Sequence, residues 1–251
     1  MSTLFVGKNI IELDECKSVN THAIELLKAV NLPEGTVIWT QKQTAGRGQR
    51  GNTWHSEDGK NLTLCFIFQP RFLTASNSFL LSMTISLALH DVLTEILPKT
   101  AVIKIKWPND ILVDGKKIAG ILIENILREE QILNSVIGVG FNVNQINFGE
   151  LNNKTNSLKL LTKNEHDLPN VMDLLCSKTE KKYLQLRTKD FASVKSQYLK
   201  FLYLLGYEHE FTLPTGLKFR GWITDVSLSG EVLIENNELG SRKFRTREIS
   251  F

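Results

Sequence analysis

The chain has 251 residues, of which 42% are hydrophobic and 23% are charged, and its formal net charge at pH 7 is +3. This is globular composition with enough residues for a large core, and it excludes a disordered or collagen-like chain. The charge is too small to indicate nucleic-acid binding by itself.

The first hundred residues are predicted to alternate between helix and strand. A helix is expected after Ser18, because this residue type caps helix starts and an apolar face follows it as far as Pro33. Strands are expected at 36–41 and 62–68, and the second is nearly all apolar, which is typical of a central strand. Apolar residues recur at helical spacing over 78–97, which predicts a long and mostly buried helix.

The middle of the chain is predicted to form a group of strands. Asp114-Gly115 lies between two apolar runs, which is a strong hairpin signal. The run before it alternates with period two and so has one polar face. The strands expected here cover residues 102–107, 111–113, 117–124 and 131–140.

The last part of the chain changes character after Gly206. Residues 145–165 are polar and loop-like, and helices are expected at 168–187 and 190–205. Short alternating runs separated by turns then predict a small antiparallel β-barrel. We therefore predict two domains, 1–206 and 207–251, with an α+β fold followed by an all-β module.

Targeting and metal signals are missing from the sequence. No run approaches the roughly 18–20 apolar residues of a membrane span, and the first residues lack signal-peptide character. Cys16, Cys65 and Cys176 are far apart, which favours reduced thiols. Neither they nor the five histidines have metal-ligand spacing. We expect a cytoplasmic protein with no membrane contact and no structural metal.

Residues 46–51 form the glycine-rich segment Gly-Arg-Gly-Gln-Arg-Gly. Its spacing also fits a dinucleotide-binding fingerprint, but that motif requires a helix after the glycines and an acid about 20 residues later. The residues that follow have turn chemistry, and Gln69-Pro70-Arg71 occupies the expected acid position. A mobile loop for an anionic ligand and a plain surface loop remain the two alternatives.

A second segment, Lys106-Trp107-Pro108-Asn109-Asp110, ends in an amide and a carboxylate after a proline that fixes the turn. Such groups suit a nucleotide and its Mg²⁺. Together with the glycine-rich loop, this segment suggests a site where a carboxylate meets a nucleoside triphosphate.

The order of these motifs resembles the biotin protein ligase family, the biotin–[acetyl-CoA-carboxylase] ligases. The resemblance runs from about residue 10 to the C-terminus and implies a class II synthetase-like mixed sheet with flanking helices, followed by an SH3-like barrel. Its motifs are Ser18-Val19-Asn20, Gln43-Thr44-Ala45, the glycine-rich loop, Trp54, Asn61-Leu62, Lys106 to Ile111, Lys117 to Glu124, and Gly138 to Asn142.

The resemblance implies a two-step reaction. Biotin and MgATP give biotinyl-5′-AMP and pyrophosphate, and a lysine of a biotin carboxyl carrier protein domain then takes the biotinyl group. Lys117 and Arg47 are the implied catalytic cations, with Lys117 bridging the biotin carboxylate and the α-phosphate. Biotin, ATP and Mg²⁺ are the implied ligands.

The resemblance also implies which residues bind each ligand. Ser18 is expected both to cap its helix and to bind the ureido ring of biotin, for which Gln43 also has suitable groups. Asn109 is expected to meet Mg²⁺-bound phosphate, and Asp110 to fix the turn through its backbone. The expected biotin-binding residues are Ser18, Val19, Asn20, Gln43, Arg47, Gly48, Gln49, Trp54, Lys117 and Gly120. The expected ATP-binding residues are Lys106, Asn109, Asp110 and Asn142, with Asn109 facing Mg²⁺ through ATP.

Two residues depart from the family pattern, since Val19 replaces a common threonine and Gln49 a common arginine. Some members carry an N-terminal DNA-binding domain, whereas here the catalytic motifs begin almost at Met1, so we expect no specific DNA binding. A homodimer remains open. Two other functions also remain as alternatives, a lipoate or octanoate ligase or transferase and a non-catalytic binding module.

Overall fold

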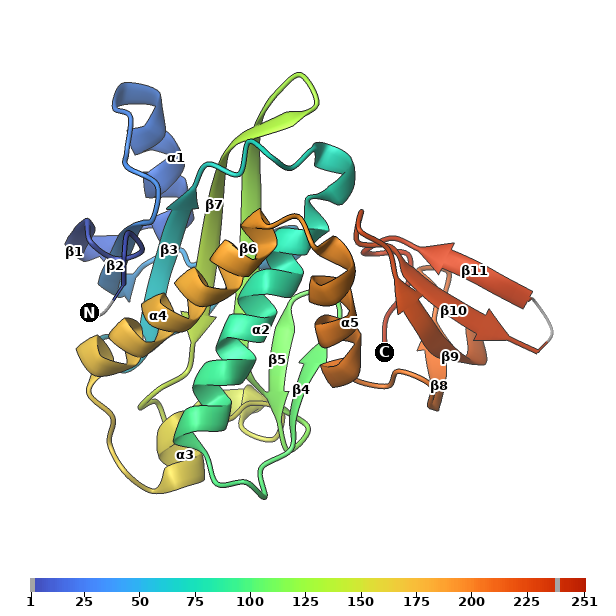
Figure 1. Cartoon of the computed structure of the whole chain (residues 1–251). Helices are drawn as coiled ribbons and strands as arrows, with labels where there is room; N and C mark the ends of the chain where they lie inside the picture. The colour runs from blue at the N-terminus through green and yellow to red at the C-terminus, as the bar shows by residue number, and fades with distance from the viewer. Residues whose placement is uncertain (1–2, 238–239) are drawn as a thin grey trace.

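The computed structural model describes residues 3–237 and 240–251, which form a seven-stranded sheet with helices and a separate four-stranded antiparallel sheet (Figure 1). The predicted fold class, α+β followed by a small β module, is confirmed.

The large sheet has the strand order β1-β2-β3-β7-β6-β5-β4. Its strands are β1 (Ile10–Cys16), β2 (Thr36–Gln43), β3 (Leu62–Phe68), β4 (Ile103–Lys106), β5 (Asp110–Val113), β6 (Lys116–Arg128) and β7 (Gln131–Phe141). The small sheet contains β8 (Glu208–Thr212), β9 (Lys218–Val226), β10 (Val232–Asn236) and β11 (Gly240–Phe244). The helices are α1 (Val19–Ala29), α2 (Phe79–Ile96), α3 (Leu158–Thr162), α4 (Leu168–Arg187) and α5 (Phe191–Phe201).

Two elements were not expected from the sequence. β1 pairs in parallel with β2, and α1 makes the crossover between them. Its acidic residues disfavour a strand, but as an edge strand it leaves their side chains exposed. The five-residue α3 lies in the polar segment that was expected to be a loop, and Ser157 caps its start.

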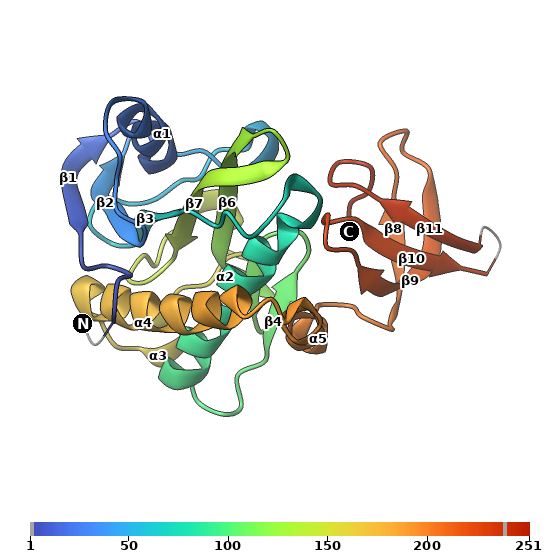
Figure 2. The same ribbon diagram turned by 45° about the horizontal axis from the view of Figure 1, so that its top comes forward.

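The two faces of the large sheet carry different helices. Leu64 and Phe66 of β3 belong to the main core with α2 and α4, whereas Cys65 and Ile67 belong to a second cluster with α1. Successive residues of a strand point to opposite faces, so α1 lies on the face opposite α2 and α4. Figures 1 and 2 show α2 and α4 side by side across the sheet.

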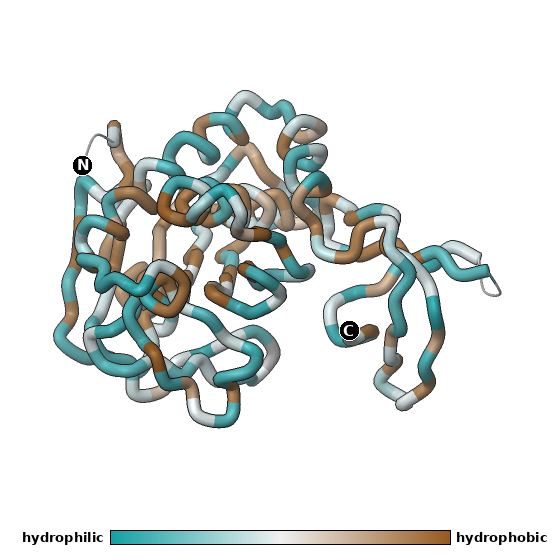
Figure 3. The backbone as a smooth tube through the Cα atoms, turned by 90° about the horizontal axis from the view of Figure 1, so that it is seen from below, coloured by the Kyte–Doolittle hydropathy of each residue, from teal (hydrophilic) through white to brown (hydrophobic). Residues whose placement is uncertain are grey.

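The helix α2 corrects one expectation. The 22-residue segment Ala75–Ile96 is long and apolar enough to cross a membrane by length and composition, although no such run was expected. Its most apolar window is 72% buried inside the protein, which is what a core helix requires. Figure 3 likewise shows apolar stretches inside the larger part of the chain.

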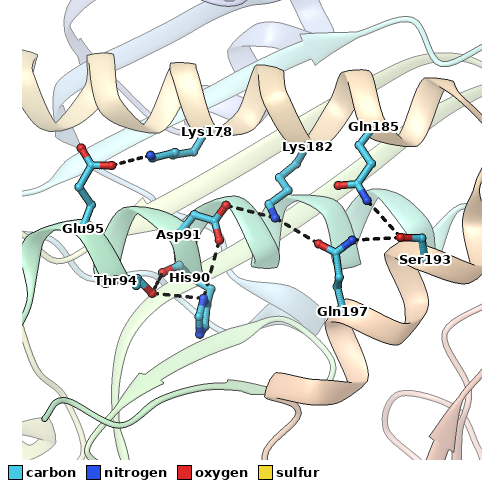
Figure 4. A network of polar contacts seen from close by, with 9 residues as sticks. All are labelled: His90, Asp91, Thr94, Glu95, Lys178, Lys182, Gln185, Ser193 and Gln197. Carbon is cyan, nitrogen blue, oxygen red and sulfur yellow. Dashed lines mark hydrogen bonds and ion pairs between the residues drawn. The ribbon is translucent and has the colours of Figure 1, made fainter. Parts of the chain in front are cut away.

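Polar contacts join α2, α4 and α5 on the outer side of the helical layer (Figure 4). Asp91 pairs with Lys182 at 3.1 Å and Glu95 with Lys178 at 2.5 Å, which links α2 to α4. Gln185 donates to Ser193, which links α4 to α5. These contacts hold α2, α4 and α5 together on the face of the sheet opposite α1.

The small sheet lies beyond α5, at the opposite end of the molecule from β1 (Figure 2). Its strand order is β11-β10-β9-β8, and Ser250 pairs back to Thr212 of β8. The buried Trp107 donates its indole N–H to Gly230 at 3.0 Å, and its ring stacks on Phe251. The predicted domain boundary after residue 206 falls between α5 and β8.

Candidate active site

A cavity lies on the α1 face of the large sheet, with about 680 Å³ of empty space including its open mouth. Strand pairing aligns Thr63, Gly140, Gly120 and Asp110 in one row across β3, β7, β6 and β5. Two of these residues are glycines, so the middle of the row leaves room above the sheet. This row forms the floor of the cavity.

Lys117 reaches the same cavity because the β5–β6 ladder contains a bulge. Ile111 pairs with Ala119 but Leu112 pairs with Lys117, which leaves Ile118 as an extra residue. In a regular strand Lys117 and Gly120 would point to opposite faces. The bulge reorients Lys117, and both residues line the cavity. Lys116 lies outside it, on another surface.

The ammonium group of Lys117 has two neighbours. Its Nζ lies 2.7 Å from Asp110 Oδ1 and 5.6 Å from the centre of the Trp54 ring. The Lys117 backbone is fixed independently, because its N–H donates to Lys154 O at 2.9 Å and its carbonyl accepts from Asn156 N at 2.7 Å. Lys117 is thus anchored by its backbone while its side chain faces the cavity.

Trp54 forms one wall of the cavity. A Cβ added at Gly140 would collide with the indole ring, and one added at Gly120 would be in tight contact with it. The two glycines therefore allow the ring to lie against β6 and β7. The buried indole N–H of Trp54 makes no hydrogen bond to any residue in the described ranges, so it is available to a bound ligand.

The glycine-rich loop forms a small hairpin over the cavity. Arg47 pairs with Thr53, Gly48 N donates to Asn52 O at 2.7 Å, and Trp54 N donates to Gly46 O at 3.0 Å. The segment contains only a three-residue 3₁₀ turn, Gln49–Gly51, and no α-helix follows it. The fingerprint of a dinucleotide-binding helix is therefore missing, as predicted.

The start of α1 forms the opposite wall. Val19 N donates to Gln43 Oε1 at 2.9 Å, which joins α1 to the end of β2. The buried Asn20 donates to Leu122 O at 3.1 Å. The expectation that Ser18 also caps the helix is wrong, because its side chain makes no capping hydrogen bond. Ser18 is instead one of the residues that line the cavity.

The side chains of Asn109 and Asp110 make different contacts within the protein. Asn109 Nδ2 donates to Ile121 O at 2.9 Å, so its amide ties the turn to β6. Asp110 pairs with Lys117, and among the residues that the structure describes its side chain makes no hydrogen bond to its own turn. The role of fixing the turn, expected for Asp110, therefore belongs to Asn109.

Asn109 and Asp110, which carry an amide and a carboxylate, are both among the residues that line the cavity. Mg²⁺ is commonly held by one or two carboxylates together with substrate phosphates, and this donor set fits that mode. Among residues 3–237 and 240–251 no cluster of three or more His, Cys, Asp or Glu side chains forms a metal site. A metal ion here would therefore need ligands from the nucleotide.

Two predicted nucleotide-binding residues lie outside the cavity lining. Lys106 Nζ donates to Phe251 O at 2.5 Å. Burial lowers the pKa of Lys106, the charge of Asp110 raises it, and those of Lys117 and Lys154 lower it further. The buried Asn142 donates its side-chain amide to Asn156 O at 3.1 Å. All ten predicted biotin-binding residues line the cavity.

Other lining residues were not singled out as ligand-binding residues from the sequence. Thr63 is the one hydroxyl residue in an otherwise apolar strand, and this interruption was the available signal. Gly138 and Gly140 of β7 were expected to let the strand approach the ligand closely, because glycine inside a strand marks a close approach, and both line the cavity. The further lining residues are Asn52, Thr53, Thr63, Leu64, Ile121, Leu122, Gly138, Val139 and Gly140.

Residues 14–142, which include every side chain of this cavity, match the family model described as Biotin/lipoate A/B protein ligase family. The chain belongs to this family. As a member of it, the chain is 31% identical over 254 residues to the bifunctional ligase/repressor BirA of Bacillus subtilis, a match that covers 99% of the chain and 76% of BirA.

Two further members of the family extend the comparison. The biotin–[acetyl-CoA-carboxylase] ligase of Paracoccus denitrificans is 34% identical over 128 residues, which are 50% of this chain and 51% of that protein. The solved biotin protein ligase from Aquifex aeolicus in complex with biotin and ATP superposes with a TM-score of 0.78 and 28% identity. That superposition covers 97% of this chain and 98% of the Aquifex chain.

Proposed function

We propose that this protein is an ATP-dependent biotin protein ligase. In the first step a biotin carboxylate oxygen attacks the α-phosphorus of ATP, and the bond from that phosphorus to the β-phosphate oxygen breaks. The products are biotinyl-5′-AMP and pyrophosphate. In the second step a lysine amine of a biotin carboxyl carrier protein domain attacks the acyl carbon, forming an amide and releasing AMP and a proton.

The observation that carries this proposal is that two cationic side chains and a serine line the same cavity. Arg47 and Lys117 line it together with Ser18, whose hydroxyl has no capping partner. Two anions, a carboxylate and a phosphate, must meet in adenylation, and fixed positive charge stabilises their approach. The ureido ring of biotin needs neutral donors and acceptors, which Ser18 and Gln43 supply.

Each residue has a distinct role in this proposal. Lys117 exchanges its contact with Asp110 for the carboxylate and α-phosphate as negative charge develops between them. The glycine-rich loop closes over the mixed anhydride and excludes water, and Arg47 brings its charge with the loop. Trp54 covers the apolar part of biotin. Asp110 and Asn109 would hold Mg²⁺, which neutralises the phosphate charge when bound.

A lipoate or octanoate ligase or transferase is the alternative within the same family. The polar groups at Ser18 and Gln43 favour a ureido ring over a purely apolar acyl chain. Competition decides between them, because excess lipoate should leave biotin adenylation unchanged in a biotin ligase.

Mass spectrometry tests the proposal. Protein incubated with biotin and MgATP should carry biotinyl-AMP, and adding a biotin carboxyl carrier domain should increase the mass of that domain by one biotinyl group. Omitting ATP should abolish both signals. Absence of the adenylate at saturating biotin and MgATP would refute the proposed activity. The carrier, the cytoplasmic location, the lack of specific DNA binding and the homodimer stay predictions.

A further inference from the structure

Glu124 of β6 joins the glycine-rich loop to the α1 side of the cavity. It lies on the same strand face as the cavity-lining residues Leu122 and Gly120, which are two and four residues before it. Its two carboxylate oxygens have different partners. Oε1 accepts from Arg47 Nη2 at 3.0 Å, and Oε2 accepts from Asn20 Nδ2 at 3.0 Å. One side chain therefore contacts both a loop residue and a cavity-wall residue.

The contact with Arg47 ties the glycine-rich loop to β6. Arg47 Nη1 donates to Thr21 Oγ1 at 3.2 Å, in addition to the ion pair with Glu124. Among the residues the structure describes, Glu124 is the only acidic side chain within ion-pair distance of Arg47. The Glu124 side chain is 25% exposed, so its charge is screened less than that of a fully exposed carboxylate.

We propose that Glu124 is a positioning residue that holds the glycine-rich loop closed over the cavity through Arg47 and keeps Asn20 oriented in the cavity wall. An arginine has five N–H donors, so contacts with Glu124 and Thr21 leave others for an anion in the cavity. Pairing with Glu124 thus fixes the position of the guanidinium group and leaves some of its N–H donors for a ligand. Glu124 itself takes no part in the bond-making steps.

The consequence for catalysis rests on the proposed ligase activity. A closed loop retains biotinyl-AMP and shields it from water until a carrier lysine arrives. Losing the Glu124 tie should therefore accelerate release of the adenylate while leaving the cations of the site in place. The loop effect itself does not require any ligand.

Hydrogen exchange of the ligand-free protein tests the tie directly. The amides of Gly48 and Trp54 are hydrogen-bonded within the loop hairpin, so their exchange reports its opening. In Glu124→Gln, a nearly isosteric change, exchange of residues 46–54 should rise about two- to fivefold, the range expected for a partly exposed ion pair. Arg47→Ala should give a similar rise, and the double variant should add nothing beyond Arg47→Ala.

A matched control is available in the small sheet. Glu231 is 24% exposed and pairs with Arg245 at 3.2 Å, so Glu231→Gln removes a similar ion pair far from the loop. It should leave exchange of residues 46–54 at the wild-type rate. Wild-type exchange in Glu124→Gln, or fully additive effects in the double variant, would overturn the proposal.

A second readout separates this inference from the proposed function. With biotin and MgATP, Glu124→Gln should release biotinyl-AMP faster than wild type, whereas Glu231→Gln should not. If wild-type protein forms no biotinyl-AMP, the ligase proposal fails, but the exchange experiment still decides whether Glu124 closes the loop. An unchanged release rate beside raised exchange would overturn the role of Glu124 in retaining the adenylate.

Discussion

A serine at the start of a helix can cap the helix or bind a ligand, and the contacts of the Ser18 hydroxyl distinguish these two roles. It makes no capping hydrogen bond and lines the cavity, so removing it should affect ligand binding and not α1. In Ser18→Ala the Kd for biotin should rise about 5- to 30-fold, which corresponds to losing one hydrogen bond of roughly 1–2 kcal/mol. Isothermal titration calorimetry measures the Kd.

Ser157→Ala is the control for this prediction. The Ser157 hydroxyl does cap a helix, because it accepts from Leu160 N at 3.2 Å. Its removal should lower the free energy of unfolding by about 1 kcal/mol, whereas Ser18→Ala should leave the unfolding midpoint unchanged. A destabilised Ser18→Ala with normal biotin affinity would reverse the two roles.

Lys117 should be required for adenylation and dispensable for folding. Its backbone hydrogen bonds to Lys154 and Asn156 survive truncation of the side chain, so Lys117→Ala should keep its unfolding midpoint. Biotin-dependent ATP–pyrophosphate exchange should fall at least about 100-fold, the effect of removing one preorganised charge-stabilising group. Lys116→Ala, which alters a lysine outside the cavity, should exchange at the wild-type rate. Substantial exchange in Lys117→Ala would contradict this role.

At the scale of the strands, the row of small residues should set the room available to the ligand. A methyl group at Gly140 collides with the Trp54 ring, so Gly140→Ala must displace that wall. Its Kd for biotin should rise about 5- to 150-fold, which corresponds to the roughly 1–3 kcal/mol cost of inserting a methyl group into a packed space. Calorimetry measures this, and circular dichroism should show the fold retained. Wild-type affinity would mean that Trp54 does not form a wall of the biotin site.

The sequence predicted those strand features that depend on local chemistry. Asp114 and Gly115 both have positive φ, 51° and 78°, which is why Asp-Gly so strongly indicated the β5–β6 hairpin. The Ile118 bulge could not be predicted, because its register is decided by pairing with β5. β1 was missed because an exposed edge strand tolerates acidic residues.

In the candidate site, contacts between residues far apart in the sequence could not be predicted either. Glu124 was recognised as part of a motif, but its contacts with Asn20 and Arg47 span 104 and 77 residues. The sequence placed Lys106 in the nucleotide site by its neighbours alone, whereas the folded chain directs its ammonium group to Phe251. Local patterns thus identified the participating segments, and tertiary packing decided which side chains meet.

For the whole molecule, Trp107 is a joint between the large sheet and the C-terminal sheet. It is 3% exposed, precedes the Pro108 turn of the cavity, and donates to Gly230 of the small sheet. Trp107→Phe keeps an aromatic ring but removes the donor, which leaves a buried carbonyl unpaired. The free energy of unfolding should fall by roughly 1–3 kcal/mol, the cost of an unsatisfied buried polar group.

Urea denaturation measures this loss, and biotin titration shows where it acts. Neither Trp107 nor Gly230 is among the residues that line the cavity, so the Kd for biotin should stay near the wild-type value. Trp222→Phe is the control, because this half-buried tryptophan of β9 has no side-chain hydrogen bond among the described residues and should lose less stability. Equal losses in the two variants would mean that ring packing, and not the Trp107–Gly230 hydrogen bond, joins the two parts. An unchanged midpoint in Trp107→Phe would mean that the two sheets are held together elsewhere, with Lys106 and Phe251 as the next contact to remove.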